Sequence, residues 1–206
     1  MIIAIDGPAA AGKGTLARRI AAALNLPYLD TGLLYRAVGR RVLDAGADPA
    51  DPGAATQAAK CLTAADLART DLRGGPADKA ASQVASIPGV RAALLEFQRH
   101  FGTENGAVLD GRDIGTVIFP NADVKFFVTA SLETRAARRH AELVGRGHDV
   151  SLEAVRADLV ARDEADANRK AAPLVAANDA IHVDTTALDA DAAFARAVEL
   201  IRSREK

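Results

Sequence analysis

The sequence contains no tryptophan, one cysteine and one methionine, and only 4% of its 206 residues are aromatic. The single cysteine, Cys61, cannot form an internal disulfide or a zinc cluster, so we expect a cytoplasmic protein. No apolar run approaches the roughly 20 residues that a membrane helix requires. The first residues, Met1–Asp6, lack the basic segment of a signal peptide and read as a strand instead. These absences argue against a disulfide-stabilised scaffold and against a membrane protein.

Neither sign of charge dominates the chain. Its 26 basic and 27 acidic residues give a net charge of −1, so electrostatics predict neither a nucleic-acid partner nor a membrane partner. Alanine is abundant, with 47 residues, and it is the strongest helix former. A hydrophobic content of 49% suits one domain whose core relies on Leu, Val, Ile and Phe.

Apolar segments alternate with helical periodicity along the chain. Buried strands are predicted at residues 2–5, 107–109, 124–128 and 181–183, with a short extended piece at 28–29. Helical patterns are found after Ser131 and at residues 13–24, 31–45, 77–86, 89–101, 151–169 and 190–203. Thr31 is the expected N-cap of the second helix. Such alternation predicts βαβ units and a parallel sheet, and no linker divides the chain into independent domains.

A glycine-rich loop follows the first strand and opens the first helix. Its spacing is that of a phosphate-binding P-loop, G-x-x-x-x-G-K, and we expect it to bind ATP. It consists of Gly7, Pro8, Ala9, Ala10, Ala11, Gly12, Lys13, Gly14 and Thr15. The glycines let backbone N–H groups point at a phosphate, and the helix N-terminus adds a positive dipole end. Lys13 supplies a compact charge for the β- and γ-phosphates.

The loop departs from the common motif at one position. Gly14 replaces the Ser or Thr whose hydroxyl usually ligates Mg²⁺, and Thr15 follows it. We therefore expect no direct protein ligand for the metal. Nucleotide oxygens and water would carry Mg²⁺, an arrangement that this ion tolerates.

Three uses of such a loop compete: an NTPase motor, a GTP switch and a small-molecule kinase. A motor usually carries Asp-Glu after its second strand, but here Asp110 is followed by Gly111 and Arg112. A GTP switch carries Asn-Lys-x-Asp, which this sequence does not contain. The pattern therefore favours a kinase.

The loop ending Gly-Lys-Gly-Thr resembles that of the nucleoside-monophosphate kinases. Further segments, in the same order and spacing, resemble the blocks of bacterial cytidylate kinase. They are Asp30–Arg36 (DTGLLYR), Ala81–Ala85 (ASQVA) with Pro88 and Val90-Arg91, Asp110–Thr116 (DGRDIGT), and Arg162–Leu174. The resemblance covers nearly the whole chain. Each block alone is weak, and together they are specific.

The resemblance implies a fold and an activity. The expected fold is an α/β P-loop NTPase fold, with a five-stranded parallel sheet flanked by helices, a small NMP-binding insertion and a short lid. Residues 1–206 would form one kinase domain, with an acceptor-binding subdomain at about 32–102 and a lid at about 138–165. The implied reaction is phosphoryl transfer from ATP, with Mg²⁺, to CMP or dCMP by a monomer.

The resemblance also implies roles for individual residues. Arg36 and Arg112 would hold the acceptor phosphate, to which the forked guanidinium is suited. Thr31 and Tyr35, in the same block as Arg36, would also bind the substrate. Arg162 and Asp166 would bind the ribose. The residues implied to read cytosine are Ser82, Arg91, Asp113 and Arg169. A carboxylate at Asp113 can accept a hydrogen bond from the cytosine amine, whereas uracil has a carbonyl there.

A basic helix follows Ser131 and resembles the mobile lid of such kinases. It carries Arg135, Arg138 and Arg139, and Arg146 follows between Gly145 and Gly147. We expect Arg138 to bind ATP and Arg139 to act in catalysis. The other expected catalytic residues are Lys13, Arg112 and Asp110, the last steadying the water shell of Mg²⁺. A general base is unnecessary because an acceptor phosphate, with a second pKa of about 6, is already largely dianionic.

The resemblance weakens between Val42 and Gly75, where longer bacterial members carry a small β-rich insertion. Asp78 and Lys79 also stand where the family's second block has small or amide residues. Two alternatives stay open. One is a kinase for another small acceptor, and the other is a nucleotide-binding regulatory protein without turnover.

Overall fold

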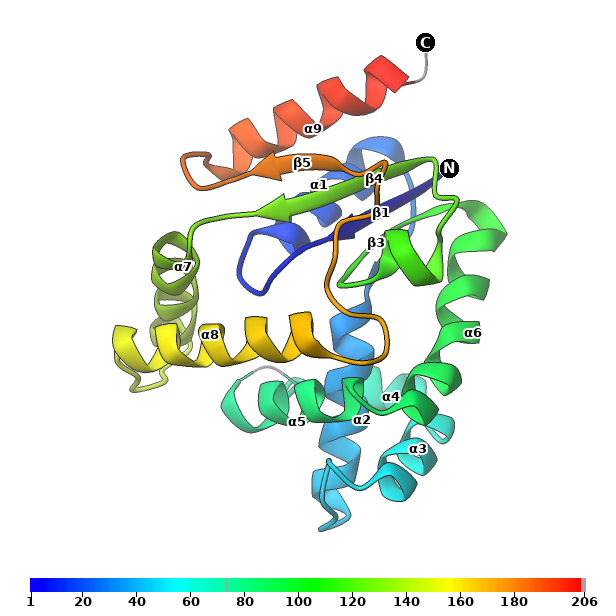
Figure 1. Ribbon diagram of the computed structural model, residues 1–206, viewed down its shortest axis with the longest axis vertical. Helices are drawn as coiled ribbons and strands as arrows, with labels where there is room; N and C mark the ends of the chain where they lie inside the picture. Colours follow the sequence, from blue (N-terminus) through cyan, green and yellow to red (C-terminus); the bar gives the residue numbers. More distant parts are fainter. Residues whose placement is uncertain (73, 205–206) are drawn as a thin grey trace.

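The computed structural model describes residues 1–72 and 74–204. Within these ranges a five-stranded, all-parallel sheet has the order β2-β3-β1-β4-β5. Its strands are β1 (Ile2–Asp6), β2 (Tyr28–Asp30), β3 (Ala107–Gly111), β4 (Val124–Thr129) and β5 (Ile181–Asp184). The predicted P-loop fold is thus confirmed, with β1 at the centre of the sheet and the loop at its carboxyl end (Figure 1).

Alternation along β1 sorts side chains to the two faces of the sheet. Ile3 and Ile5 pack into a core with residues of α1 (Lys13–Leu24) and α9 (Ala190–Arg204). Ala4 belongs to the core on the other side, which α6 (Pro88–Asn105) covers. Because both faces of the central strand are buried, β1 is apolar from Ile2 to Ile5, and its polar residue, Asp6, comes at the carboxyl end.

A group of helices lies beyond the strand ends, in the lower half of Figure 1. It comprises α2 (Thr31–Asp44), α3 (Pro52–Lys60), α4 (Ala64–Leu67) and α5 (Gly75–Ala85). With the first half of α6 these helices share a separate core that contains Leu34, Val38, Val84 and Val90. Asp51 caps α3 through the N–H of Ala54, at 2.6 Å. Among the described residues 47–104 the chain is helical or irregular and adds no strand to the molecule.

Two more helices, α7 (Leu132–Gly145) and α8 (Leu152–Asn168), pack against each other beside the phosphate loop. Val155 and Leu159 of α8 join Ala9 of the loop and Ala136 of α7 in a small apolar cluster. As expected, Ser131 caps α7, accepting from the N–H of Thr134 at 3.2 Å. Of the residues in 1–72 and 74–204, none belongs to a helix that is long and apolar enough to cross a membrane.

Two local features differ from the sequence expectations. The N-cap of α2 is Asp30, whose carboxylate accepts from the N–H of Leu33 at 3.1 Å, so the prediction of Thr31 as the cap is wrong. Both residue types cap helices well, and the chain turns one residue earlier than expected. A π-helical turn, η1 (Ile114–Ile118), follows β3 and has no counterpart in the sequence prediction.

Candidate functional site

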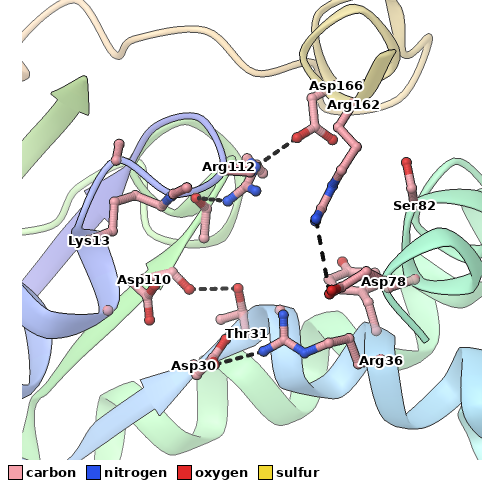
Figure 2. A pocket seen from close by; sticks show the side chains of 18 of the residues that line it. Lys13, Asp30, Thr31, Arg36, Asp78, Ser82, Asp110, Arg112, Arg162 and Asp166 are labelled. Atoms are coloured by element: carbon pink, nitrogen blue, oxygen red, sulfur yellow. Dashed lines mark hydrogen bonds and ion pairs between the residues drawn. The ribbon is translucent and has the colours of Figure 1, made fainter. Parts of the chain in front are cut away.

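A cavity of about 310 Å³ opens at the carboxyl ends of β1, β2 and β3 (Figure 2). One wall is the phosphate loop, here residues 9–15. The facing wall, which we call the arginine wall, contains five lining arginines from α2, α6, α8 and the turn after β3: Arg36, Arg91, Arg112, Arg162 and Arg169. Parallel sheets bind ligands at this edge, so the placement marks a functional site.

The phosphate loop needs glycine at its first position. Gly7 has φ +147°, and a Cβ there would lie 2.0 Å from the carbonyl oxygen of Val128. The side chain of Lys13 folds back over the loop and donates to the carbonyl of Pro8 at 2.7 Å. Gly7 and Pro8 do not line the cavity themselves; they shape the loop that does.

Lys13 is buried, at 5% exposed, in a strongly charged setting. Burial and the nearby Arg112 guanidinium lower the pKa of its ammonium to about 7, against the opposing attraction of Asp110 and Asp6. A phosphate that arrives beside this group raises its pKa again and restores its positive charge, so anion binding there is coupled to proton uptake.

Asp6 is a residue whose role sequence reasoning missed. Its carboxylate accepts from the N–H groups of Ile114 and Gly115, both at 2.8 Å. Burial raises the pKa of Asp6 to about 6, although those two hydrogen bonds oppose the shift. Asp6 therefore ties β1 to the turn that carries Arg112 and Asp113. An acidic residue directly after a buried strand was the available signal.

Asp110 ends β3 and faces the phosphate loop. Its carboxylate accepts from the hydroxyl of Tyr28 at 2.8 Å, and its backbone carbonyl accepts from the hydroxyl of Thr31 at 2.8 Å. Burial and the charge of Asp30 raise the pKa of Asp110. Thr31 lines the cavity, but its hydroxyl proton is committed to the protein.

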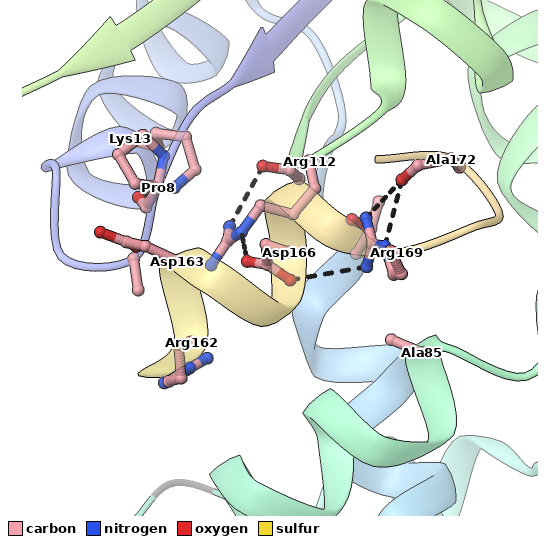
Figure 3. Close-up of polar contacts among 12 residues, drawn as sticks. Pro8, Lys13, Ala85, Arg112, Arg162, Asp163, Asp166, Arg169 and Ala172 are labelled. Atoms are coloured by element: carbon pink, nitrogen blue, oxygen red, sulfur yellow. Dashed lines mark hydrogen bonds and ion pairs between the residues drawn. The ribbon is translucent and has the colours of Figure 1, made fainter. Parts of the chain in front are cut away.

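Each arginine of the arginine wall has a carboxylate within 4.0 Å. Arg112 donates to Asp166 at 2.7 Å, and Arg36 donates to Asp30 at 2.8 Å (Figures 2 and 3). Burial raises the pKa of Asp166, but the charge and hydrogen bond of Arg112, together with the charges of Arg169 and Arg162, outweigh it, so the net shift is downward. Each guanidinium is thus held in place by an anion before any ligand arrives.

A second polar cluster lies deeper, around Asp113. Arg91 donates to the Asp113 carboxylate, and its guanidinium lies 5.6 Å from the ring centre of Tyr35. Arg169 donates twice to the carbonyl of Ala172, at 3.1 and 2.6 Å, which fixes its orientation (Figure 3). Ser82 lies on α5 at the same cavity. The residues predicted to contact the base are therefore brought together, from four separate segments.

The arginines of α7 divide into two groups. Arg139 lines the cavity. Arg138 lies outside the lining and donates to Thr185 and Leu188 in the loop after β5. Arg135 is buried, pairs with Asp163 at 2.6 Å and donates to the carbonyl of Ala9 at 3.3 Å, bracing the phosphate loop. An ATP contact by Arg138 stays a prediction.

Comparison with known proteins identifies relatives along the whole chain. Residues 3–203 match the family model described as cytidylate kinase. A cytidylate kinase of Acidiphilium cryptum is 64% identical over 201 residues, covering 98% of this chain and 95% of that protein. One of Granulibacter bethesdensis is 60% identical over 204 residues, covering 99% and 98%. The match covers 95% and 98% of these two relatives, so they contain no long segment after Val42 that this chain lacks.

Solved structures agree on the fold alone. A crystal structure of an uncharacterised protein from Eubacterium ventriosum superposes with a TM-score of 0.59 and covers 98% of this chain and 99% of that one. Its sequence identity is 16%, so the likeness extends to the architecture and no further.

Proposed function

The chain belongs to the cytidylate kinase family, and on that premise we propose that it converts ATP and CMP or dCMP into ADP and CDP or dCDP. The enzyme transfers the γ-phosphoryl group of ATP to the phosphate of the cytidine nucleotide. One observation carries the proposal: a single cavity has the phosphate loop on one side and the arginine wall on the other. Two anionic nucleotides bound there would face each other with their phosphates close, which is the main requirement of phosphoryl transfer.

The phosphate loop is proposed to hold ATP. Backbone N–H groups of the loop and the N-terminus of α1 surround the β-phosphate, and Lys13 reaches toward the transferred group. Once its charge is restored by the phosphates, Lys13 stabilises the negative charge that shifts to the leaving oxygen. Arg139 of α7, which lines the same cavity, contributes a further positive charge there.

Arg36 and Arg112 are proposed to bind the acceptor phosphate. Their forks are preoriented by Asp30 and Asp166, and a dianionic phosphate offers them the same bidentate acceptor geometry. Its oxygen attacks the γ-phosphorus directly, and no side chain has to remove a proton first. Arg162 and Asp166 lie on one face of α8 and are proposed to contact the ribose.

The cluster around Asp113 is proposed to recognise cytosine. The carboxylate accepts from the exocyclic amine, while Arg91, Arg169 and Ser82 donate to the ring nitrogen and the carbonyl. The Asp113 side chain is only 7% exposed and keeps its pair with Arg91, so a base that presents a carbonyl to it sets one acceptor against another in a desolvated site. Discrimination against uracil follows from that penalty.

Mg²⁺ is proposed as the metal that accompanies ATP. A Cβ on Gly14 would lie 3.8 Å from the Asp110 carboxylate, so the position of the usual metal-binding hydroxyl faces Asp110. In the described part of the chain, no three His, Cys, Asp or Glu side chains group to hold a metal on their own. These residues fit an ion held by phosphate oxygens and water, with Asp110 beside its water shell. The ion neutralises phosphate charge.

The organisation of the chain supports a mobile lid over a fixed sheet. We propose that residues 32–102 bind the acceptor and that residues 138–165 form the lid, whose closure excludes water from the transferred phosphoryl group. The separate core of α2, α3, α5 and α6 favours such a subdomain. We further propose that the enzyme is monomeric and cytoplasmic, the latter in keeping with its single cysteine.

The decisive experiment is an ADP-release assay with Mg·ATP and each of CMP, dCMP, UMP, AMP, GMP and dTMP. We expect turnover with CMP and dCMP only. Turnover with another acceptor would keep the phosphate loop and refute the cytosine contacts. ATP binding without any acceptor-dependent turnover would instead indicate a regulatory protein.

A further inference from the structure

Asp78 lies at the start of α5, across the cavity from the phosphate loop, and the proposed reaction assigns it no role. Its carboxylate accepts from Arg139 of α7 and lies 4.0 Å from the guanidinium of Arg162 on α8 (Figure 2). The backbone N–H of Gly74 also donates to it, at 3.3 Å. One side chain of the acceptor-side helices thus joins both helices of the proposed lid.

The setting makes this contact strong. The side chain of Asp78 is 11% exposed and that of Arg139 is 17% exposed, so solvent screens the pair weakly. Arg139 has a second carboxylate partner, Glu142, at 2.8 Å, but Glu142 is on the same helix and is 37% exposed. Among the described residues, Asp78 is therefore the partner of Arg139 that connects different parts of the fold.

The same guanidinium is needed by the proposed reaction. A phosphate offers Arg139 the same charge and the same oxygen acceptors as a carboxylate does. Arg139 cannot give its full fork to both groups. Asp78 consequently competes with the phosphates of ATP for an arginine that lines the cavity.

We propose that Asp78 is a positioning residue that substitutes for phosphate in the nucleotide-free enzyme. In the nucleotide-free enzyme it holds Arg139 of α7 toward α5, and the phosphates of ATP take its place beside Arg139 when they bind. This proposal rests on the proposed function in one respect: ATP is taken to be the anion that displaces Asp78 from Arg139.

Two consequences follow. Binding of ATP includes the cost of breaking the Asp78–Arg139 pair, so the wild-type affinity is lower than the phosphate contacts alone would give. Without Asp78, the empty site loses the carboxylate that ties Arg139 of α7 and Arg162 of α8 to α5, and the lid moves away from α5. Loss of the Asp78 carboxylate should therefore strengthen ATP binding and, in the nucleotide-free enzyme, weaken the contact between the lid and α5.

The test compares Asp78→Asn with the wild type by calorimetric titration with a non-hydrolysable ATP analogue and Mg²⁺. We expect the variant to bind about 3- to 10-fold more tightly. The KM for ATP should fall by a similar factor while kcat changes less than twofold. Asp78→Glu, which keeps the charge, should restore the wild-type affinity. Unchanged or weaker binding by Asp78→Asn would overturn the proposal.

Glu142→Gln is the matched control, because it also removes a carboxylate from Arg139. We expect less than a twofold change in affinity. If Glu142→Gln tightens binding of the ATP analogue as much as Asp78→Asn does, the cause is the general gain of positive charge. The bridging role of Asp78 is then refuted. Thermal unfolding checks that each variant is folded, and Asp78→Ser replaces Asp78→Asn if the amide disrupts α5.

A distance measurement reports the contact without any catalysis. Spin labels at Lys79→Cys on α5 and Ala157→Cys on α8, in a Cys61→Ser background, are expected to be close and narrowly distributed in the nucleotide-free protein. Asp78→Asn should broaden and lengthen that distribution, and an unchanged distribution would count against the proposal. A wild-type protein that keeps the narrow distribution yet fails to phosphorylate CMP would refute the proposed function instead.

Discussion

The phosphate loop comes from nine consecutive residues, whereas the arginine wall draws on helices and a turn between Arg36 and Arg169. The loop is shaped by backbone geometry, with glycines at positions such as Gly7 where a Cβ would collide with the chain. The wall is held by side chains, as carboxylates orient guanidinium groups across elements. In the proposed function, the local motif binds the phosphates of ATP, and the dispersed side chains bind the phosphate and the base of the acceptor.

The largest effect is expected in the loop, at Lys13. Lys13→Ala removes the buried charge beside the transferred phosphate and should lower turnover at least about 100-fold. The change removes one hydrogen bond to the carbonyl of Pro8 but none within the helices or the sheet, so far-ultraviolet circular dichroism should be unchanged. An ADP-release assay gives the rate. Activity within tenfold of the wild type would remove the phosphate assignment.

In the arginine wall, Asp113 should govern selectivity more than rate. Asp113→Ala removes the proposed acceptor for the cytosine amine and should reduce the preference for CMP over UMP by about 10-fold. The measurement is kcat/KM for both nucleotides under the same conditions. Asp113→Asn keeps one acceptor oxygen and should lose less. Equal selectivity in variant and wild type would refute base recognition by this residue.

The contrast between loop and wall explains what could be predicted from the sequence. The strands, the main helices and the phosphate loop follow from periodicity and from a contiguous motif, and the structure confirms them. The pairs Arg91–Asp113 and Arg112–Asp166 join residues 22 and 54 positions apart, which no local pattern reveals. Those residues were found through a family resemblance, and their pairing was not foreseen.

Residues that support the site were missed for a similar reason. Asp6 reads as the end of a strand, and only the fold brings it to the N–H groups of Ile114 and Gly115. Arg138 and Arg139 are adjacent in the sequence, yet one points to the loop after β5 and the other into the cavity. Helix orientation decides this, and it depends on tertiary packing.

The depressed pKa of Lys13 gives a smaller effect that is specific to the loop. At pH 8 the free enzyme, with a pKa of about 7, holds Lys13 mostly neutral. Phosphates raise the pKa, so ATP binding should take up a fraction of one proton at pH 8 and little at pH 6. Calorimetry in two buffers of different ionisation enthalpy measures the uptake. The Lys13→Ala variant should show none, and uptake in that variant would assign the proton to another group.

The smallest effect of a substitution is expected at an arginine that is not part of the arginine wall and does not line the cavity. Arg69 pairs with Asp44 at 2.6 Å and with Asp71 at 2.7 Å, but its side chain is 33% exposed and these pairs lie in solvent. Because water screens such pairs and ordering them costs entropy, Arg69→Ala should lower the Tm by no more than about 3 °C. CMP selectivity should not change, because Arg69 does not line the cavity. If Arg69→Ala lowered CMP selectivity as much as Asp113→Ala does, the exposed ion pairs of Arg69 would shape the arginine wall just as its buried ion pairs do. The proposed difference between exposed and buried pairs would then be refuted.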